Sequence, residues 1–435
     1  MAISGRVPLL ALIGIIPVVL WPAPLAVLGW ALLVAALVAV DLILALAPQR
    51  LLLSRDLPSS VRLSQPARSR LTVTNPSGRT ARLQLRDAWP PSAHPAVERP
   101  RLVLRGGESL RQTTQLMPSR RGDLAAGGVT VRSFGPLGLA ARQQTIPVPG
   151  VLRVLPEFRS RSQLPYRLAR LREMDGQASV HVRGQGTEFD SLREYAIGDD
   201  VRSIDWRASA RATKTMVRTW RPERDRHILI VLDTSRWAAG RLAGRDGSDQ
   251  TRLDAGIETC LLMAALGAAS GDRISLLVAD QQIRLRLPGT GKGSVLAAFA
   301  DGLSQVEPVL GEPDWTQIAE QVAQLCRQRS LVILVTGLDP ALYADGVGTV
   351  LAGLSAAHQV LIAHVTDPHT AAAATAPATA TEAYDAAADA RLWLGTQALV
   401  QRVGRLGVDV VQANPDGLAP AVCDRYLALK AAGRL

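Results

Sequence analysis

The stretch that decides the fold joins a charged segment, GQGTEFDSLREYAIGDDVRSIDWRASARATKTMVRTWRPERDR (residues 184–226), to an apolar run, HILIVLDTS (residues 227–235). The apolar run is continuous in Ile, Leu and Val, which is typical of a strand buried on both faces of a parallel sheet. Downstream, strand-type and helix-type segments alternate to the C-terminus. This alternation predicts an open, doubly wound α/β sheet with helices on both faces over residues 227–435.

The charged segment has two interpretations. Its acids and arginines alternate closely, so an Arg–carboxylate network would fix this weakly apolar segment onto a neighbouring sheet, because a planar guanidinium binds a carboxylate through two directed bonds. The same groups would also suit a recognition surface for a partner. The partner-binding candidates are Glu188, Arg193, Glu194, Gly198, Asp199, Asp200, Arg202, Asp205 and Trp206.

We expect the segment to combine both roles. Ile204 and Trp206 flank Asp205 with bulk that favours burial, which predicts that Asp205 and Trp206 are structural. The turn at Gly198–Asp200 joins a glycine to two carboxylates, a composition that stays solvated and is therefore available to a partner.

Motifs in this segment carry a family resemblance. They are Gly186-Thr187-Glu188-Phe189, Leu192-Arg193-Glu194-Tyr195, Gly198-Asp199-Asp200 and Arg202-Ser203-Ile204-Asp205-Trp206. Together they resemble the signature of the bacterial family called domain of unknown function 58, and we expect the resemblance to cover the whole chain. It implies, through kinship alone, an adaptor or assembly role with an ATPase of the MoxR-type AAA+ class.

The end of the apolar run resembles the metal-binding loop of von Willebrand factor A domains, Asp-x-Ser-x-Ser, which implies Mg²⁺ held through oxygen atoms. Asp233 and Ser235 match, but Trp237 stands where the second serine belongs. Gly337 follows Thr336 where the pattern places an aspartate, and nothing in the spacing selects Thr290 as a further ligand. We therefore expect a degenerate site without tight metal, and Mg²⁺ remains the one cofactor candidate.

The N-terminus predicts a membrane hairpin over residues 1–50. No charged residue occurs from Val7 to Val40, and Trp21-Pro22-Ala23-Pro24 divides this apolar run. Two crossings follow, about Val7–Trp21 and Leu25–Ala47, because proline breaks helices and one crossing needs about 20 apolar residues. A cleaved signal peptide is the alternative. We expect Asp41 to lie at the interface with its carboxylate in water.

Arginines on both sides of the hairpin predict that its two ends face the cytoplasm. They are Arg6 before it and Arg50, Arg55, Arg62, Arg68 and Arg70 after it. The expected location is therefore the bacterial inner membrane, with two spans and the bulk of the chain cytoplasmic.

Between the membrane segment and the charged segment, residues 51–157 alternate in short runs separated by turn residues, which predicts a small immunoglobulin-like β-sandwich. Residues 158–226 follow as a linker with an amphipathic helix at about Gln163–Met174 and the signature motifs. No catalytic constellation occurs in either part.

Composition narrows the functional classes. The net charge is +11, but no basic run interleaves with aromatic residues, so nucleic acid is not an expected partner. Cys260, Cys326 and Cys423 lie far apart without a CxxC pair, which indicates neither a zinc site nor a disulfide framework.

The resulting hypothesis is a membrane-anchored adaptor that binds lipid through its hairpin and an ATPase through its cytoplasmic domains. One alternative is a hydrolase that uses the acids around Asp199, Asp200 and Asp205. Another is a cell-envelope scaffold without an ATPase partner.

Overall fold

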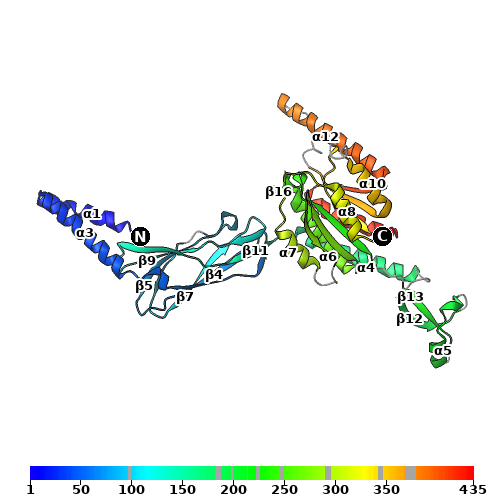
Figure 1. Cartoon of the computed structure of the whole chain (residues 1–435), viewed down its shortest axis with the longest axis horizontal. Helices are drawn as coiled ribbons and strands as arrows, with labels where there is room; N and C mark the ends of the chain where they lie inside the picture. The colour runs from blue at the N-terminus through cyan, green and yellow to red at the C-terminus, as the bar shows by residue number, and fades with distance from the viewer. Residues whose placement is uncertain are drawn as a thin grey trace. The chain divides into compact units, whose positions relative to one another are not determined.

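We analysed a computed structural model of the chain. It describes residues 1–96, 99–181, 188–196, 199–212, 214–221, 226–243, 249–289, 295–340, 346–367 and 379–435. Contacts divide the chain into two compact units, Met1–Glu157 and Phe158–Leu435, and Figure 1 shows the elements of each.

In the first unit, a two-residue strand, β1 (Ala2–Ile3), is followed by three apolar helices, α1 (Arg6–Ile13), α2 (Ile15–Leu20) and α3 (Pro24–Leu44). One helical stretch, Pro24–Arg50, is long and apolar enough to cross a membrane, with a mean hydropathy of 2.6, and Arg6–Leu20 is shorter. By length and composition, a membrane anchor and a signal sequence both fit. The first expected crossing, about Val7–Trp21, is divided at Gly14 into the two short helices α1 and α2.

Gly14 is where the first and third helices meet. The indole Nε1 of Trp30 on α3 donates a hydrogen bond of 3.1 Å to the carbonyl of Leu10 on α1. A Cβ atom at Gly14 would lie 2.2 Å from Trp30 Cδ1, so this close approach needs glycine. Helices α1 and α3 therefore pack against each other through Trp30, which contacts Gly14 and the Leu10 carbonyl.

A β-sandwich follows the helices. Its sheets have the strand orders β1-β10-β9-β5-β6, β2-β4-β7 and β3-β11-β8. The strands are β1 (Ala2–Ile3), β2 (Leu52–Asp56), β3 (Ser60–Arg62), β4 (Ala67–Thr74), β5 (Ala81–Asp87), β6 (Arg101–Leu104), β7 (Ser109–Leu116), β8 (Gly122–Ala125), β9 (Val129–Phe134), β10 (Ala140–Ile146) and β11 (Val151–Leu155). Leu71 and Val73 of β4 pack with Leu83 of β5 and Val131 of β9 in one core, so two sheets face each other.

Asp41 fixes the end of α3 to this sandwich. Its carboxylate accepts hydrogen bonds from the backbone N–H groups of Leu137 (2.8 Å), Leu139 (2.7 Å) and Ala140 (2.9 Å). The side chain is fully buried, so the expectation of a carboxylate in water is wrong. The physical reason is that the turn between β9 and β10 supplies three donors in place of water.

The position of Arg55 also differs from the expectation. The sequence predicts that Arg55 lies beside the membrane segment at the cytoplasmic face, but its side chain is fully buried inside the sandwich. Its guanidinium donates two bonds, of 3.0 and 2.7 Å, to the carboxylate of Asp87 on β5. The indole of Trp89 also donates to Asp87, at 3.0 Å. Arg55 therefore holds two strands together instead of facing lipid.

The second unit contains a six-stranded sheet with the order β18-β17-β14-β19-β20-β21, parallel except for β18 at the edge. Its strands are β14 (His227–Asp233), β17 (Arg273–Ala279), β18 (Ile283–Leu287), β19 (Leu331–Val335), β20 (Gln359–Val365) and β21 (Asp409–Ala413). β14 is buried throughout, as its unbroken apolar run predicts.

Helices cover both faces of this sheet. Ile228 and Ile230 of β14 pack in one core, and Leu229 and Val231 pack in another. The first core includes α4 (Leu164–His181), α6 (Arg252–Ala269), α7 (Val295–Ser304) and α13 (Pro415–Ala431). The second includes α8 (Trp315–Leu325), α10 (Gly348–Ala357) and α12 (Ala380–Arg405). The linker helix α4 runs seven residues further than the expected end at Met174.

Candidate functional site

The signature motifs form a hairpin that is a sheet of its own. Strand β12 (Glu188–Glu194) pairs antiparallel with β13 (Met216–Arg221), and between them lie the 3₁₀ helix η4 (Val201–Ser203) and α5 (Trp206–Ala212). We call these four elements the signature hairpin. Its two strands pair only with each other among the described strands, so the expected attachment to a neighbouring sheet is not found.

Arg193 and Asp199 close the loop of the signature hairpin. The guanidinium of Arg193 donates two bonds to the carboxylate of Asp199, at 2.8 and 2.5 Å. The backbone N–H of Ala196 donates a third bond, at 2.9 Å, to the same carboxylate. The bond to Asp199 raises the pKa of Arg193. Asp199 is therefore engaged inside the hairpin, unlike the solvated turn carboxylate that was expected.

Asp205 caps α5. Its carboxylate accepts from the backbone N–H groups of Arg207 (3.0 Å) and Ala208 (2.9 Å), as helix caps do. It also binds the guanidinium of Arg218 on β13 at 2.8 Å. The bond from Ala208, followed by the bond from Arg218, lowers the pKa of Asp205.

Trp206 is 70 % exposed, which contradicts the expected burial. It begins the short helix α5, which has no buried residue because no second layer covers it among the described elements. Val201 (61 %) and Leu192 (38 %) are also exposed in the signature hairpin. Three apolar side chains in one small element therefore face solvent.

The remaining candidates are placed as follows. Glu194 forms an exposed ion pair with Lys214 at 3.0 Å. Asp200 is exposed and accepts the backbone N–H of Arg202 at 3.0 Å, and Arg202 is also exposed. Only the backbone of Glu188 is described, and Gly198 lies outside the described residues.

The second candidate location is the carboxyl end of the six-stranded sheet. Asp233, 2 % exposed, is the last residue of β14. Its carboxylate accepts from the Thr336 hydroxyl at 2.6 Å and from the backbone N–H of Ser235 at 2.8 Å. Burial is the largest influence on this carboxyl and raises its pKa, against the effect of these bonds. Thr336, which the sequence did not identify as a partner of Asp233, therefore holds this carboxylate in place together with the Ser235 N–H.

Asp280 was missed by sequence reasoning. It follows β17, the neighbour of β14, and the carboxyl ends of parallel strands meet at one edge, so this position was a usable signal. Its carboxylate accepts from Thr234 at 3.0 Å and from Arg284 at 2.7 Å. Burial would raise the pKa of Asp280, but the bonds from Arg284, the Gln282 N–H and Thr234 together lower it.

Trp237 covers this edge. A Cβ atom at Gly337 would lie 2.3 Å from Trp237 Cδ1, so the indole rests directly on that glycine. The other indole contacts are the stacked ring of His364, at 5.9 Å between centroids, and the guanidinium of Arg252, at 5.6 Å. Burial lowers the pKa of His364 to about 4, so this ring is neutral near pH 7.

These residues do not fit a tight Mg²⁺ site. The Ser235 hydroxyl is buried near Asp233, has no well-formed hydrogen bond to a described residue, and would be a suitable ligand. However, Asp233 is engaged by two donors, and an indole lies against Gly337, where the resemblance would place an oxygen. Mg²⁺ requires a near-ideal octahedron of oxygen ligands. Among the described residues, no group of three or more His, Cys, Asp or Glu is suited to a metal, and Thr290 lies outside them.

A family model matches a stretch that includes most of the hairpin and most of the α/β sheet. Residues 191–403 match the family model described as protein of unknown function DUF58. The DUF58 region therefore includes most of the signature hairpin and the six-stranded sheet as far as β20. The expected resemblance over the whole chain is narrowed to this range.

Curated proteins similar to this chain are uncharacterized mycobacterial proteins. One from Mycobacterium bovis and one from each of two Mycobacterium tuberculosis strains are 25 % identical over 198 residues. The match covers 43 % of this chain and 57 % of each relative, so it spans little more than half of their length.

Solved structures were also compared. A FixG-related protein from Vibrio parahaemolyticus is 10 % identical and covers 24 % of this chain and 96 % of its own, with a TM-score of 0.18. The CARDB domain of a Pyrococcus furiosus protein, solved with two metal ions, is 11 % identical, covers 26 % and 92 %, and has a TM-score of 0.18. Likeness at this level carries no argument about this chain.

Proposed function

We propose that the chain is a membrane-anchored adaptor whose signature hairpin docks a partner protein. The observation that carries this proposal is the exposure of Trp206, Val201 and Leu192 within one hairpin. Exposed apolar surface gains about 25 cal/mol per Å² when a partner covers it, and tryptophan is among the residues that dominate interfaces.

The charges of the signature hairpin support a binding surface more than a hydrolytic site. Asp199 is held by Arg193, and Asp205 caps a helix and binds Arg218. Carboxylates engaged in this way hold the shape of the surface and are not poised to accept a proton from water. For this reason we do not favour the hydrolase alternative.

The partner we propose is an ATPase of the MoxR-type AAA+ class. This choice rests on the motif resemblance, and the exposed side chains indicate only where such a partner would dock. A scaffold without an ATPase would present the same hairpin to another protein, so the experiment must use the ATPase itself.

Binding of the full chain in mild detergent to a MoxR-type ATPase from the same genome tests this proposal. We expect Trp206→Ala to weaken binding by about thirtyfold, equivalent to a hot spot of about 2 kcal/mol. Trp393→Ala on α12 is the matched control, because Trp393 is also exposed, at 48 %.

Three outcomes decide the matter. Loss of binding in Trp206→Ala alone supports docking at the hairpin. Loss in Trp393→Ala alone would move the docking surface to α12. If the wild-type chain shows no binding to the ATPase at micromolar concentration, the ATPase is not its partner.

We also propose that the apolar helices cross the bacterial inner membrane twice and are retained, with the rest of the chain cytoplasmic. Ala2–Ile3 pair with β10, and Asp41 binds the turn that precedes β10. Both ends of the helical segment are thus held by one sheet. If α3 crosses the membrane, α1 and α2 must cross it in the opposite direction, since a single crossing would separate β1 from β10.

A further inference from the structure

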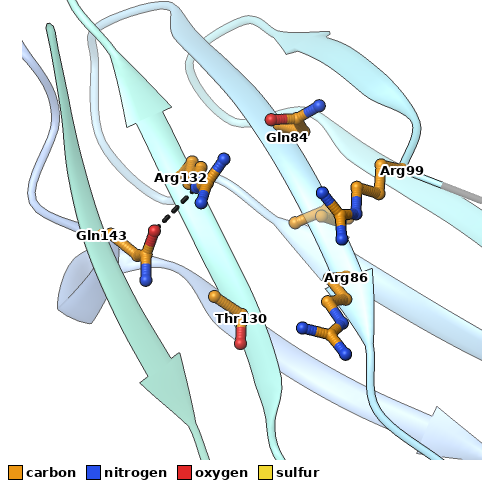
Figure 2. A pocket seen from close by; sticks show the side chains of 7 residues that line it. Gln84, Arg86, Arg99, Thr130, Arg132 and Gln143 are labelled. Atoms are coloured by element: carbon orange, nitrogen blue, oxygen red, sulfur yellow. Dashed lines mark hydrogen bonds between the residues drawn. The ribbon is translucent and has the colours of Figure 1, made fainter. Parts of the chain in front are cut away.

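A shallow hollow lies on the outer face of the five-stranded sheet in the first unit. Its volume is about 120 Å³. Figure 2 shows its polar lining, which comes from β5, β9, β10 and the segment before β6. The labelled side chains are Gln84, Arg86, Arg99, Thr130, Arg132 and Gln143.

Sheet register creates this lining. Arg132 on β9 lies opposite Gln143 on β10 and Gln84 on β5, and Thr130 lies opposite Arg86 on β5. Side chains two residues apart on a strand share a face. The row through Arg132 and the row through Thr130 therefore lie next to each other on the outer surface. Arg132 Nε donates a 2.7 Å bond to Gln143 Oε1, which orients that guanidinium across the hollow (Figure 2).

The hollow is strongly basic. Three arginines line it, and the lining residues that the structure describes include no carboxylate. Among the described residues, no ion-pair or hydrogen-bond partner is found for the side chains of Arg86 and Arg99. Other arginines of the same unit do bind acids, as Arg55 binds Asp87 at 2.7 Å and Arg153 binds Asp123 at 2.8 Å.

Gathering like charges without a counterion costs free energy, and a bound anion would remove that cost. Guanidinium groups suit phosphate oxygens in particular, because each presents several N–H donors in a planar fork. The amides of Gln84 and Gln143 and the hydroxyl of Thr130 add neutral donors around the same space.

We propose that this hollow binds a phosphate group, with Arg86, Arg99 and Arg132 as its cationic ligands. Either a soluble phosphate ester or the headgroup of an anionic phospholipid would supply the same chemistry. The site shares no residue with the signature hairpin, so this proposal does not depend on the proposed docking function.

The test uses the full chain in an uncharged detergent, with two probes. ³¹P NMR line broadening measures binding of inorganic phosphate, and native mass spectrometry compares retention of phosphatidylglycerol with that of phosphatidylcholine. The variant Arg86→Gln/Arg132→Gln removes two of the proposed ligands. The matched control is Arg68→Gln/Arg111→Gln, which makes the same charge change at exposed positions on β4 and β7.

We expect the Arg86→Gln/Arg132→Gln variant to bind about tenfold or more weakly and the control to bind like the wild type. An effect on inorganic phosphate alone indicates a soluble ligand, and an effect on phosphatidylglycerol alone indicates a lipid. If the variant misfolds, Thr130→Glu places a carboxylate in the hollow while keeping the arginines, and it should abolish binding. Equal binding by the wild type, variant and control, or equal weakening in variant and control, would overturn the site.

Discussion

Asp200 and Asp205 belong to the same hairpin but have different surroundings. Asp205 caps α5 with two accepted N–H bonds and pairs with Arg218, whereas Asp200 is exposed and accepts one bond. We predict that Asp205→Ala speeds hydrogen exchange of the α5 amides severalfold, because loss of a cap frays a short helix. Asp200→Ala, the control, should leave those amides unchanged. Equal acceleration in both variants would contradict the capping role.

A second prediction at the residue scale concerns Mg²⁺. The hydrogen bonds to Asp233 and the indole on Gly337 leave too few free oxygens for a tight site. Calorimetry of the full chain should therefore show no saturable Mg²⁺ heat at micromolar affinity, and Asp233→Ala should not change the trace. A micromolar heat that disappears in Asp233→Ala would show a working metal site.

Asp233 also predicts a pH dependence. Burial raises the pKa of its carboxyl in the folded state above the unfolded value of about 3.9. The folded state therefore binds more protons, and this group lowers the free energy of unfolding as pH rises from the unfolded pKa to the folded one. Asp233→Asn removes that dependence. The thermal midpoint of the variant minus that of the wild type should therefore increase from pH 4 to pH 8. A constant difference across this range would contradict the raised pKa.

Among the elements, the junction of α3 with the β9–β10 turn depends on Asp41. Asp41→Ala would leave two buried N–H groups and one partly buried N–H group without an acceptor, at a cost of about 1–3 kcal/mol for each buried unsatisfied group. We predict a large drop in the thermal midpoint of the full chain in detergent. Asp56→Ala is the control, since its pair with Arg70 is exposed and contributes about 0–1 kcal/mol. Similar drops in both variants would refute the special role of Asp41.

The signature hairpin is the opposite kind of element. Isolated two-stranded hairpins are marginally stable in water, and this one relies on local ion pairs instead of an apolar core. Such an element can hold a tryptophan in solvent until a partner covers it, which is consistent with a docking role.

For the whole molecule, we predict that the turn at Ala23 lies outside the cell and the sandwich inside it. In intact spheroplasts, a membrane-impermeant maleimide should label Ala23→Cys. It should label Ser109→Cys, which is exposed on β7, only after permeabilisation. The native cysteines Cys260, Cys326 and Cys423 are buried and should not interfere. Labelling of Ser109→Cys in intact spheroplasts, or a mature chain without residue 23, would contradict the double crossing.

Local pattern was sufficient for the elements. An unbroken apolar run identified β14, alternation identified most strands of the sandwich, and length with hydropathy identified α3. These inferences succeed because helix and strand periods are read from neighbouring residues, and burial of an apolar face follows from that period. The charged hairpin lacked such a period, and its two strands were not anticipated.

Long-range contacts decided the environment of the polar and aromatic residues. Asp41 is buried because donors 96 to 99 residues away reach it, and Asp233 is locked by Thr336, 103 residues away. Trp237 rests on Gly337, whereas Trp206 is 70 % exposed, with no layer over it among the described elements. Whether a carboxylate or an indole is buried depends on which sequence-distant segments pack beside it. The periodicity of neighbouring residues does not specify those long-range contacts.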